Sequence, residues 1–445
     1  MSTLTEGPRL AAPLRLLAAA AATFGVALGL FAVLGGSGGA ARPRPLGAVT
    51  FSVSAPGGST DARIARLQAL LRVQPREVDA LSTLAGAYLQ KVRETADPAF
   101  YDRAGTALRR ALALRPADAG ALTERGALEL SRHHFRAALA DAQRVRALAP
   151  EVNKPFGVLV DALVELGRYG AAGRALQAMV DLKPNLDAYT RVSYFRELHG
   201  DLPGAASALR LAVAAGGDVP ENAAYVQALS GDLELVRGRP ARAAHDYRAA
   251  LADLPHYAPA VFGLARADAA AGRVGRATRR LRALVARLPL PAYVVALGEA
   301  ELAARRPAAA RRDLALVGAE IRLLRAAGVN TDVELALYEA DHGSPRRGIV
   351  LARCALAQAP SVRSADALGW SLARAGRPRE GLSWLRRALR LGSRDPSFLY
   401  HAGAAAAAAG ERSAARVWLG RLRRQAPRFS PLYGPRAARL LEGLR

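Results

Sequence analysis

Cysteine and lysine are nearly absent from this chain of 445 residues. A single cysteine, Cys354, excludes an intramolecular disulfide framework and a metal site built from clustered thiolates. Lysine occurs only at Lys91, Lys154 and Lys183, so arginine supplies nearly all of the positive charge behind a formal net charge of +25. Such an excess can mark a surface for nucleic acid or anionic membrane. It can also reflect a GC-rich genome that encodes arginine in place of lysine, which is the interpretation we favour.

Sequence motifs that carry chemistry are also missing. The chain has no phosphate-binding loop, no pair of histidines one helical turn apart and no nucleophile elbow. His133 and His134 are adjacent, so their side chains would point apart on a helix, and we interpret them as solvated turn residues. We therefore predict no catalytic, cofactor-binding or metal-binding residue, and we predict that the protein is not an enzyme.

One long apolar run, residues 16–34, lies near the N-terminus. It contains no charge and is long enough to cross a hydrocarbon core of about 30 Å as a helix. We predict a short tail at residues 1–9 and a transmembrane or signal-anchor segment at residues 10–36. A cleaved secretory signal is an alternative, because Gly38 and Ala40 suit a cleavage site. A transit peptide and a buried helix fit less well, since the run is not amphipathic.

The location of the rest of the chain follows weakly from this segment. Two arginines lie on each side of the run, so the positive-inside rule hardly favours one membrane orientation over the other. The short N-terminus and the long C-terminal body favour export of the body. We expect a membrane-anchored protein with its body outside the cytoplasm, or a secreted or periplasmic one after cleavage. Residues 37–59, rich in Gly, Pro and Ser, are predicted to be a flexible linker.

Internal repeats organise the remaining sequence. Pro116, Pro150 and Pro184 are each 34 residues apart, and so are Pro255 and Pro289. Each of these prolines follows an amphipathic run, which is where proline ends a helix. A second set of markers, glycines that begin a short turn inside each unit, consists of Gly167, Gly200, Gly238, Gly272, Gly343, Gly376 and Gly410. A small residue also recurs in the middle of each first helix, as at Gly126 and Gly231.

Together, the three markers resemble the tetratricopeptide repeat (TPR) family, whose unit is a 34-residue helix–turn–helix. Pentatricopeptide arrays are the nearest alternative, but their period is 35 and a terminal proline is not typical of them. The resemblance implies an all-α fold: a right-handed α-solenoid of about ten units over residues 60–430, behind the N-terminal helix. A capping helix is expected at residues 431–445. We expect the seventh unit to have a long second helix over residues 308–327.

The concave surface is the candidate site. In this family the first helices line it, and their usual contact positions carry nine acids and four bases here, while arginines concentrate on second helices and turns. An acidic groove repels nucleic acid and favours a basic or mixed peptide. The candidate partner-binding residues are Asp161, Glu165, Asp187, Tyr194, Glu197, Tyr225, Asp232, Phe262, Arg266, Glu299 and Trp370.

These residues lead to a functional prediction. We expect a non-enzymatic scaffold or adaptor that binds a protein or peptide in the groove and reaches the membrane through its N-terminal segment. Two alternatives stay open: a basic convex surface that binds anionic lipid or polyanion, and a helper subunit of a membrane or secretion complex. The sequence does not define the oligomeric state or the partner.

Overall fold

The computed structural model describes residues 59–95, 97–216 and 220–444. Within these ranges every regular element is a helix, and there are 23 of them. The predicted tail, the predicted anchor segment and nearly all of the predicted linker lie outside the described residues. Among the helices that are described, none is both long enough and apolar enough to cross a membrane.

Twenty-one of the helices form ten consecutive units, numbered here in chain order. The first helices of the units are α2 (Val78–Thr95), α4 (Ala119–Ser131), α6 (Lys154–Glu165), α8 (Leu186–Leu198), α10 (Pro220–Val236), α12 (Ala258–Ala270), α14 (Pro291–Ala303), α17 (Asp332–His342), α19 (Val362–Arg374) and α21 (Pro396–Ala408). The second helices are α3 (Ala99–Leu114), α5 (Phe135–Leu148), α7 (Tyr169–Leu182), α9 (Leu202–Ala215), α11 (Pro240–Asp253), α13 (Val274–Arg287), α15 (Pro307–Leu314) with α16 (Val317–Ala326), α18 (Pro345–Gln358), α20 (Pro378–Ala388) and α22 (Arg412–Gln425). Helix α1 (Thr60–Val73) precedes them and α23 (Tyr433–Glu442) follows.

Small residues allow the two helices of a unit to approach closely. Tyr247 on α11 is fully buried between Gly231 on α10 and Gly263 on α12. A Cβ atom at Gly231 would lie 2.7 Å from the Tyr247 ring, and one at Gly263 would overlap it. The small residues in mid-helix therefore leave space into which the neighbouring helix inserts a large side chain.

The seventh unit departs from the expected pattern. The prediction of one long second helix was wrong, because the chain bends at Ala315 and Leu316 and forms α15 and α16 instead. The bend turns three apolar side chains of α16 into the interior, where Val317, Ile321 and Leu324 are each at most 4% exposed. Burial of that apolar face favours the broken helix over a straight one.

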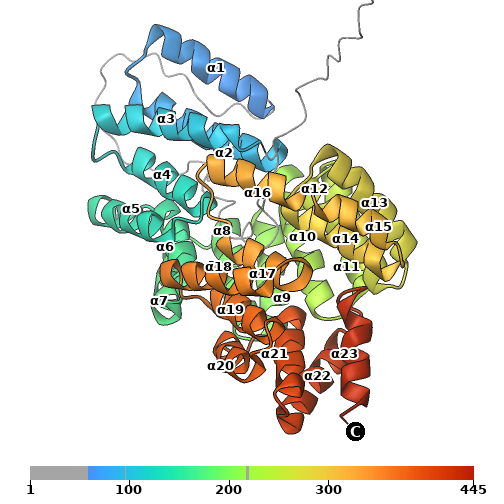
Figure 1. Cartoon of the computed structure of the whole chain (residues 1–445). Coiled ribbons are helices and arrows are strands. Elements are labelled where there is room, and N and C mark those ends of the chain that lie inside the picture. Colours follow the sequence, from blue (N-terminus) through green and yellow to red (C-terminus); the bar gives the residue numbers. More distant parts are fainter. Residues whose placement is uncertain (1–58, 96, 217–219, 445) are drawn as a thin grey trace, which may run out of the picture.

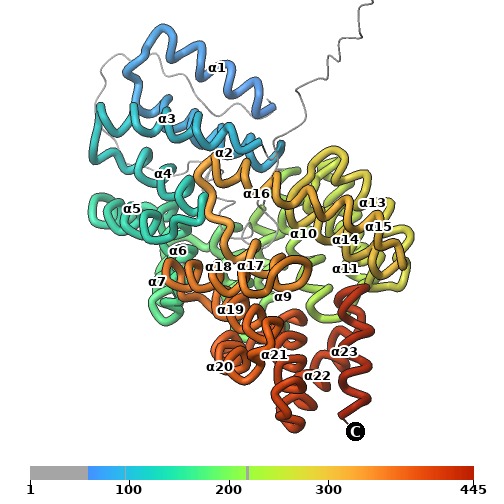
Figure 2. Tube along the Cα trace, viewed as in Figure 1, coloured from blue at the N-terminus to red at the C-terminus, as the bar shows by residue number. Residues whose placement is uncertain are grey.

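The ten units wind into a superhelix in which the later units contact the earlier ones. In Figures 1 and 2 the orange helices α17 to α19 lie beside the teal helices α5 to α7, although nearly 200 residues separate them. The backbone N–H of Asn330, after α16, donates to the carbonyl of Arg132 over 3.0 Å. The backbone N–H of Val362 donates to the Tyr169 hydroxyl over 2.8 Å. The turns of units 2 and 3 thus contact the ends of units 7 and 8.

The same pattern of contacts continues through the next two units. The backbone at Gly200, between α8 and α9, lies against the carbonyl oxygen of Gly392, which follows α20. The backbone at Gly238, between α10 and α11, lies against the carbonyl oxygen of Gln425, at the end of α22. The Gln425 side-chain amide also donates to the Val236 carbonyl over 2.7 Å. Each turn from unit 2 to unit 5 therefore meets the end of the unit five places further along, and we call these four contacts the closure contacts.

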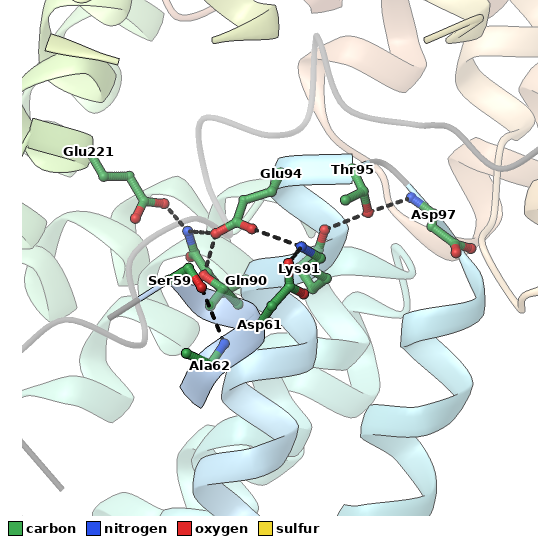
Figure 3. Close-up of polar contacts among 10 residues, drawn as sticks. Ser59, Asp61, Ala62, Gln90, Lys91, Glu94, Thr95, Asp97 and Glu221 are labelled. Carbon is green, nitrogen blue, oxygen red and sulfur yellow. Dashed lines mark hydrogen bonds and ion pairs between the residues drawn. The ribbon is translucent and has the colours of Figure 1, made fainter. Parts of the chain in front are cut away.

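The N-terminal end is tied to the array by polar contacts, shown in Figure 3. Ser59 caps α1 by accepting the Ala62 N–H over 3.2 Å. Lys91 on α2 pairs with Asp61 on α1 over 2.7 Å. The Gln90 amide donates to Glu221 at the start of α10, which joins the first unit to the fifth.

The closure contacts predict different effects for two alanine substitutions. Gly238 and Gly410 both have left-handed φ values, +71° and +81°, so alanine strains either turn by about 1–2 kcal/mol. Only at Gly238 would the new Cβ also overlap a backbone carbonyl across the superhelix, whereas nothing lies within 4 Å of a Cβ at Gly410. Gly238→Ala should therefore lower the free energy of unfolding by a further ~1–3 kcal/mol.

Urea titration would measure the stability of the two variants, and small-angle X-ray scattering would measure their radius of gyration. Gly238→Ala should expand the molecule, and Gly410→Ala should not. Equal stability and equal radius for the two variants would show that the superhelix is open in solution.

Candidate binding cavity

Closure of the superhelix converts the concave surface into a cavity of about 870 Å³. Its lining comes from units 4 to 10 and from the segment that leads into α23, and it includes His133 of unit 2. Cavities of this size hold ligands the size of small molecules. A ligand here would be a compact group or a short segment rather than a peptide laid along all ten units.

Seven of the eleven predicted partner-binding residues line this cavity. They are Tyr194, Glu197, Tyr225, Asp232, Phe262, Arg266 and Glu299. They come from α8, α10, α12 and α14, which are the first helices of units 4 to 7. The contact positions inferred from the family resemblance therefore point inward in the middle of the array.

Asp161 is not in the cavity lining, because it forms a buried ion pair. Arg191 on α8 donates to both carboxylate oxygens of Asp161 on α6, over 2.9 and 2.7 Å. Burial lowers the pKa of the Arg191 guanidinium, but the carboxylates of Asp161 and Asp187 outweigh it and raise that pKa overall. Gly157 leaves room for Arg191, since a Cβ there would lie 2.9 Å from its Cζ. Asp161 therefore holds units 3 and 4 together and is 0% exposed.

Three other predicted residues also lie outside the large cavity. Burial raises the pKa of Glu165, and the Arg363 guanidinium of unit 9 opposes that shift. Glu165 and Arg363 line a second, much smaller cavity, and Glu165 is absent from the lining of the large one. Burial likewise raises the pKa of Asp187 to about 6, against the effect of Arg191 and Lys154. Trp370 is 4% exposed and packs inside the array, stacked on His401 with ring centroids 4.3 Å apart.

The cavity lining is acidic. It contains three arginines, namely Arg266, Arg363 and Arg428. It contains seven carboxylates, namely Glu197, Asp232, Glu299, Glu334, Asp341, Asp366 and Asp395. The chain therefore encloses negative charge although its net charge is +25. Such a surface attracts cations.

Most of these carboxylates already have partners. Asp232 accepts from the Tyr247 hydroxyl over 2.7 Å and from Arg266 over 2.9 Å. Asp366 contacts His401 Nδ1 over 2.9 Å, and Glu299 contacts His342 Nε2 over 3.3 Å.

Glu197 differs, because its carboxylate forms neither a hydrogen bond nor an ion pair with another described residue. Burial raises the pKa of Glu197 to about 8, and the nearby carboxylates of Asp395 and Asp232 raise it further while Arg266 opposes them.

Aromatic rings occupy much of the remaining lining. They are Tyr194, Tyr225, Tyr257, Phe262, Tyr338, Phe398, Tyr400, Phe429 and Tyr433. Rings present a negative face, so they attract cations and also pack against alkyl stems. Arg266 illustrates this chemistry inside the site, with its guanidinium carbon 5.7 Å from the centre of the Phe262 ring and its Nη1 on Asp232.

Sequence reasoning missed several residues that complete the cavity. Asp395 precedes α21 and was outside the helix positions considered, although an Asp-Pro-Ser sequence at a helix start is a recognisable cap. Phe429 and Tyr433 follow the last unit, where no repeat pattern applies. The described residues contain no group of three His, Cys, Asp or Glu side chains placed to hold a metal ion.

Comparison with known proteins supports the resemblance to the tetratricopeptide repeat family. A tetratricopeptide repeat model matches residues 235–299, which span the turn of unit 5 through most of the first helix of unit 7. No curated protein matches the chain.

Several solved structures resemble parts of the chain. The TPR protein TTC0263 of Thermus thermophilus is 25% identical with a TM-score of 0.34, over 37% of this chain and 91% of that one. A tetratricopeptide repeat protein from Parabacteroides merdae is 15% identical with a TM-score of 0.39, over 51% and 86% of the two chains. Human IFIT1, solved as a dimer with m7Gppp-AAAA, is 15% identical with a TM-score of 0.46, over 75% and 77%. None of these likenesses identifies a ligand for this chain.

The raised pKa of Glu197 predicts a pH-dependent cost to stability. The folded chain holds this proton up to about pH 8, whereas the unfolded chain releases it near the ordinary value of 4.5. Stability contributed through this group is therefore lost as pH rises between those values. Glu197→Gln should match the wild type at about pH 5 and be more stable by ~1–3 kcal/mol at about pH 9.

Thermal melts followed by circular dichroism at the two pH values would measure this difference. The matched control is Glu442→Gln on the exposed surface of α23, which should melt with the wild type at both. A pH-independent gap between Glu197→Gln and the wild type would contradict the assignment.

Proposed function

We propose that this chain is a non-catalytic protein-binding scaffold whose interior cavity captures a basic segment of a partner protein. Tetratricopeptide-type folds are generally protein-interaction scaffolds, and the family match supports that class. The acidic and aromatic lining of the cavity carries the specific proposal, since it complements lysine and arginine side chains in both charge and shape. The cavity volume of about 870 Å³ limits the captured segment to a few residues.

Location is the second part of the proposal. The uncharged run at residues 16–34 would hold the protein in a membrane, or direct its export, with the repeat body outside the cytoplasm. Residues 37–59 would then separate the body from the membrane surface.

Protease accessibility tests this location. Protease added to intact spheroplasts should digest the repeat body, while a cytoplasmic marker protein survives. The membrane fraction should retain the undigested chain, or the soluble fraction should contain it if the segment is cleaved. Full protection of a membrane-bound repeat body would place the body in the cytoplasm and overturn the proposed orientation.

Site-specific photocrosslinking in the host cell tests partner capture. A crosslinking amino acid at Phe398, in the cavity lining, should join the chain to a discrete protein partner. The matched position is Val350 on α18, which is 62% exposed and is not part of the lining, and it should not yield that product.

Charge reversal then identifies the surface that binds the partner. Reversal of Glu197, Asp232 and Glu299 should weaken the crosslink, because three positive charges in the cavity lining would repel a basic segment. Asp161 is left out of this set, since its reversal would break a buried ion pair and unfold the protein. Reversal of the exposed Arg276, Arg279, Arg311 and Arg312 should leave the crosslink intact.

The same arginine variant tests the leading alternative, in which a basic convex surface binds anionic lipid. Those four arginines lie exposed on α13 and α15, as a surface for anionic lipid would require. Suppose that the arginine variant loses both the crosslinked partner and its binding to phosphatidylglycerol vesicles, while the acid variant still crosslinks. That result would make the convex face the functional surface.

A further inference from the structure

We propose that the cavity contains a cation subsite, formed by Ser193, Glu197, Asp232 and Asp395, that binds the guanidinium of an arginine side chain. The subsite rests on the proposed function and specifies the group that the cavity recognises. The same chemistry would bind a free organic cation such as a polyamine, and the experiment below separates the two sources.

The first observation is that the three carboxylates converge from distant parts of the chain. Glu197 lies in unit 4, Asp232 in unit 5 and Asp395 at the start of unit 10, and all three line the cavity. Asp395 and Asp232 both raise the pKa of Glu197, whose first cause is burial, so the three groups share one electrostatic environment. Arg266 opposes the shift at Glu197 and Asp232, and His401 opposes it at Asp395, where Asp366 is a further carboxylate. The four carboxylates outnumber these two cations.

The second observation concerns hydrogen-bonding atoms that the fold leaves unused. Ser193 is 4% exposed and lines the cavity, yet its hydroxyl forms no hydrogen bond within the described residues. Ser193 and Glu197 are four residues apart on α8, so they lie on one face, one turn apart. The Ser193 hydroxyl can therefore donate to, or accept from, a ligand in the cavity.

Asp395 and Asp232 each retain binding capacity. Asp395 caps α21 through Oδ1, which accepts the N–H groups of Ser397 and Phe398 over 2.7 and 3.2 Å, and those bonds do not use Oδ2. The Asp232 side chain is 48% exposed although it is paired with Arg266. Glu197 and Asp395 can therefore accept from a planar guanidinium while Asp232 supplies a longer-range attraction.

The aromatic neighbours favour an arginine over a bare metal or a small inorganic cation. Phe398 and Phe262 line the same cavity as the carboxylates, and the Phe262 ring centre lies 5.7 Å from the guanidinium carbon of Arg266. Rings stabilise a flat guanidinium face and pack against the apolar stem of the side chain. A hydrated metal ion would gain neither contact.

The experiment is isothermal titration calorimetry of the purified full chain with capped arginine, N-acetyl-arginine amide. Capped citrulline has the same shape without the charge and is the ligand control, and spermidine represents a free polyamine. Capped arginine should bind and citrulline should not. Binding of spermidine as tightly as of capped arginine would assign the subsite to a free cation. Binding of neither cation would overturn the proposal.

Two variants connect the binding to these residues. Glu197→Gln combined with Asp232→Asn and Asp395→Asn should weaken capped arginine by about tenfold or more, and asparagine retains the helix cap at position 395. The matched control neutralises three exposed acids, as Glu151→Gln, Asp181→Asn and Asp253→Asn, and should leave the affinity within about twofold. If the control weakens binding as much as the triple variant does, the effect is that of net charge and the subsite is wrong.

A gentler variant covers the case in which the triple variant unfolds. Ser193→Ala with Glu197→Gln removes no side-chain hydrogen bond or ion pair between described residues, so it should fold and still bind capped arginine several-fold more weakly. Wild-type affinity should rise from about pH 6 to about pH 9, because Glu197 ionises while the guanidinium stays charged, and this rise should shrink in the variant. A variant that binds like the wild type at both pH values would overturn the subsite.

The outcome is separable from that of partner capture. Capped arginine could bind while no protein crosslinks at Phe398, which would leave the subsite standing and the scaffold proposal wrong. A protein could crosslink through the cavity while no arginine binds, which would do the reverse.

Discussion

The closure contacts are the constraint on which the rest of this structure depends. A helical repeat unit contacts only its neighbours, and an array of such units is ordinarily held by nearest-neighbour interfaces. Here the turns of units 2 to 5 also contact the ends of units 7 to 10, through backbone groups at Arg132, Gly200 and Gly238 and through the Tyr169 hydroxyl. Stability therefore depends on contacts between distant units as well as on those between neighbours.

Closure also decides the chemical character of the interior. Carboxylates that would face water in an open groove face one another across a cavity, so burial raises the pKa of Glu197, Glu299 and Asp395. Arginines on second helices, such as Arg276 and Arg311, remain exposed outside. The molecule thus encloses an acidic interior within a basic surface, and a cation that enters the cavity exchanges water for carboxylates and aromatic rings.

Buried ion pairs also join neighbouring units. Asp161 and Arg191 link units 3 and 4 by a bidentate pair away from the cavity lining, and Asp366 and His401 link units 9 and 10 within it. Each pair satisfies charges that burial would otherwise make costly, so these residues help to orient the helices. This division explains why acids at similar helix positions have different roles along the same array.

The sequence alone determined the helical units. Proline after most second helices, glycine at most turns and small residues in mid-helix are local signals, because they act through backbone geometry and the packing of adjacent helices. Those signals predicted about ten helical units, as the structure shows, and seven of the eleven residues predicted for the site line the cavity.

Only the tertiary structure decided which units meet across the superhelix, because small rotations between units accumulate along the chain and no local pattern records their sum. For that reason the break between α15 and α16, the burial of Asp161 and the arrival of Asp395 beside Glu197 could not be predicted from the sequence. Each depends on contacts between residues far apart in the chain.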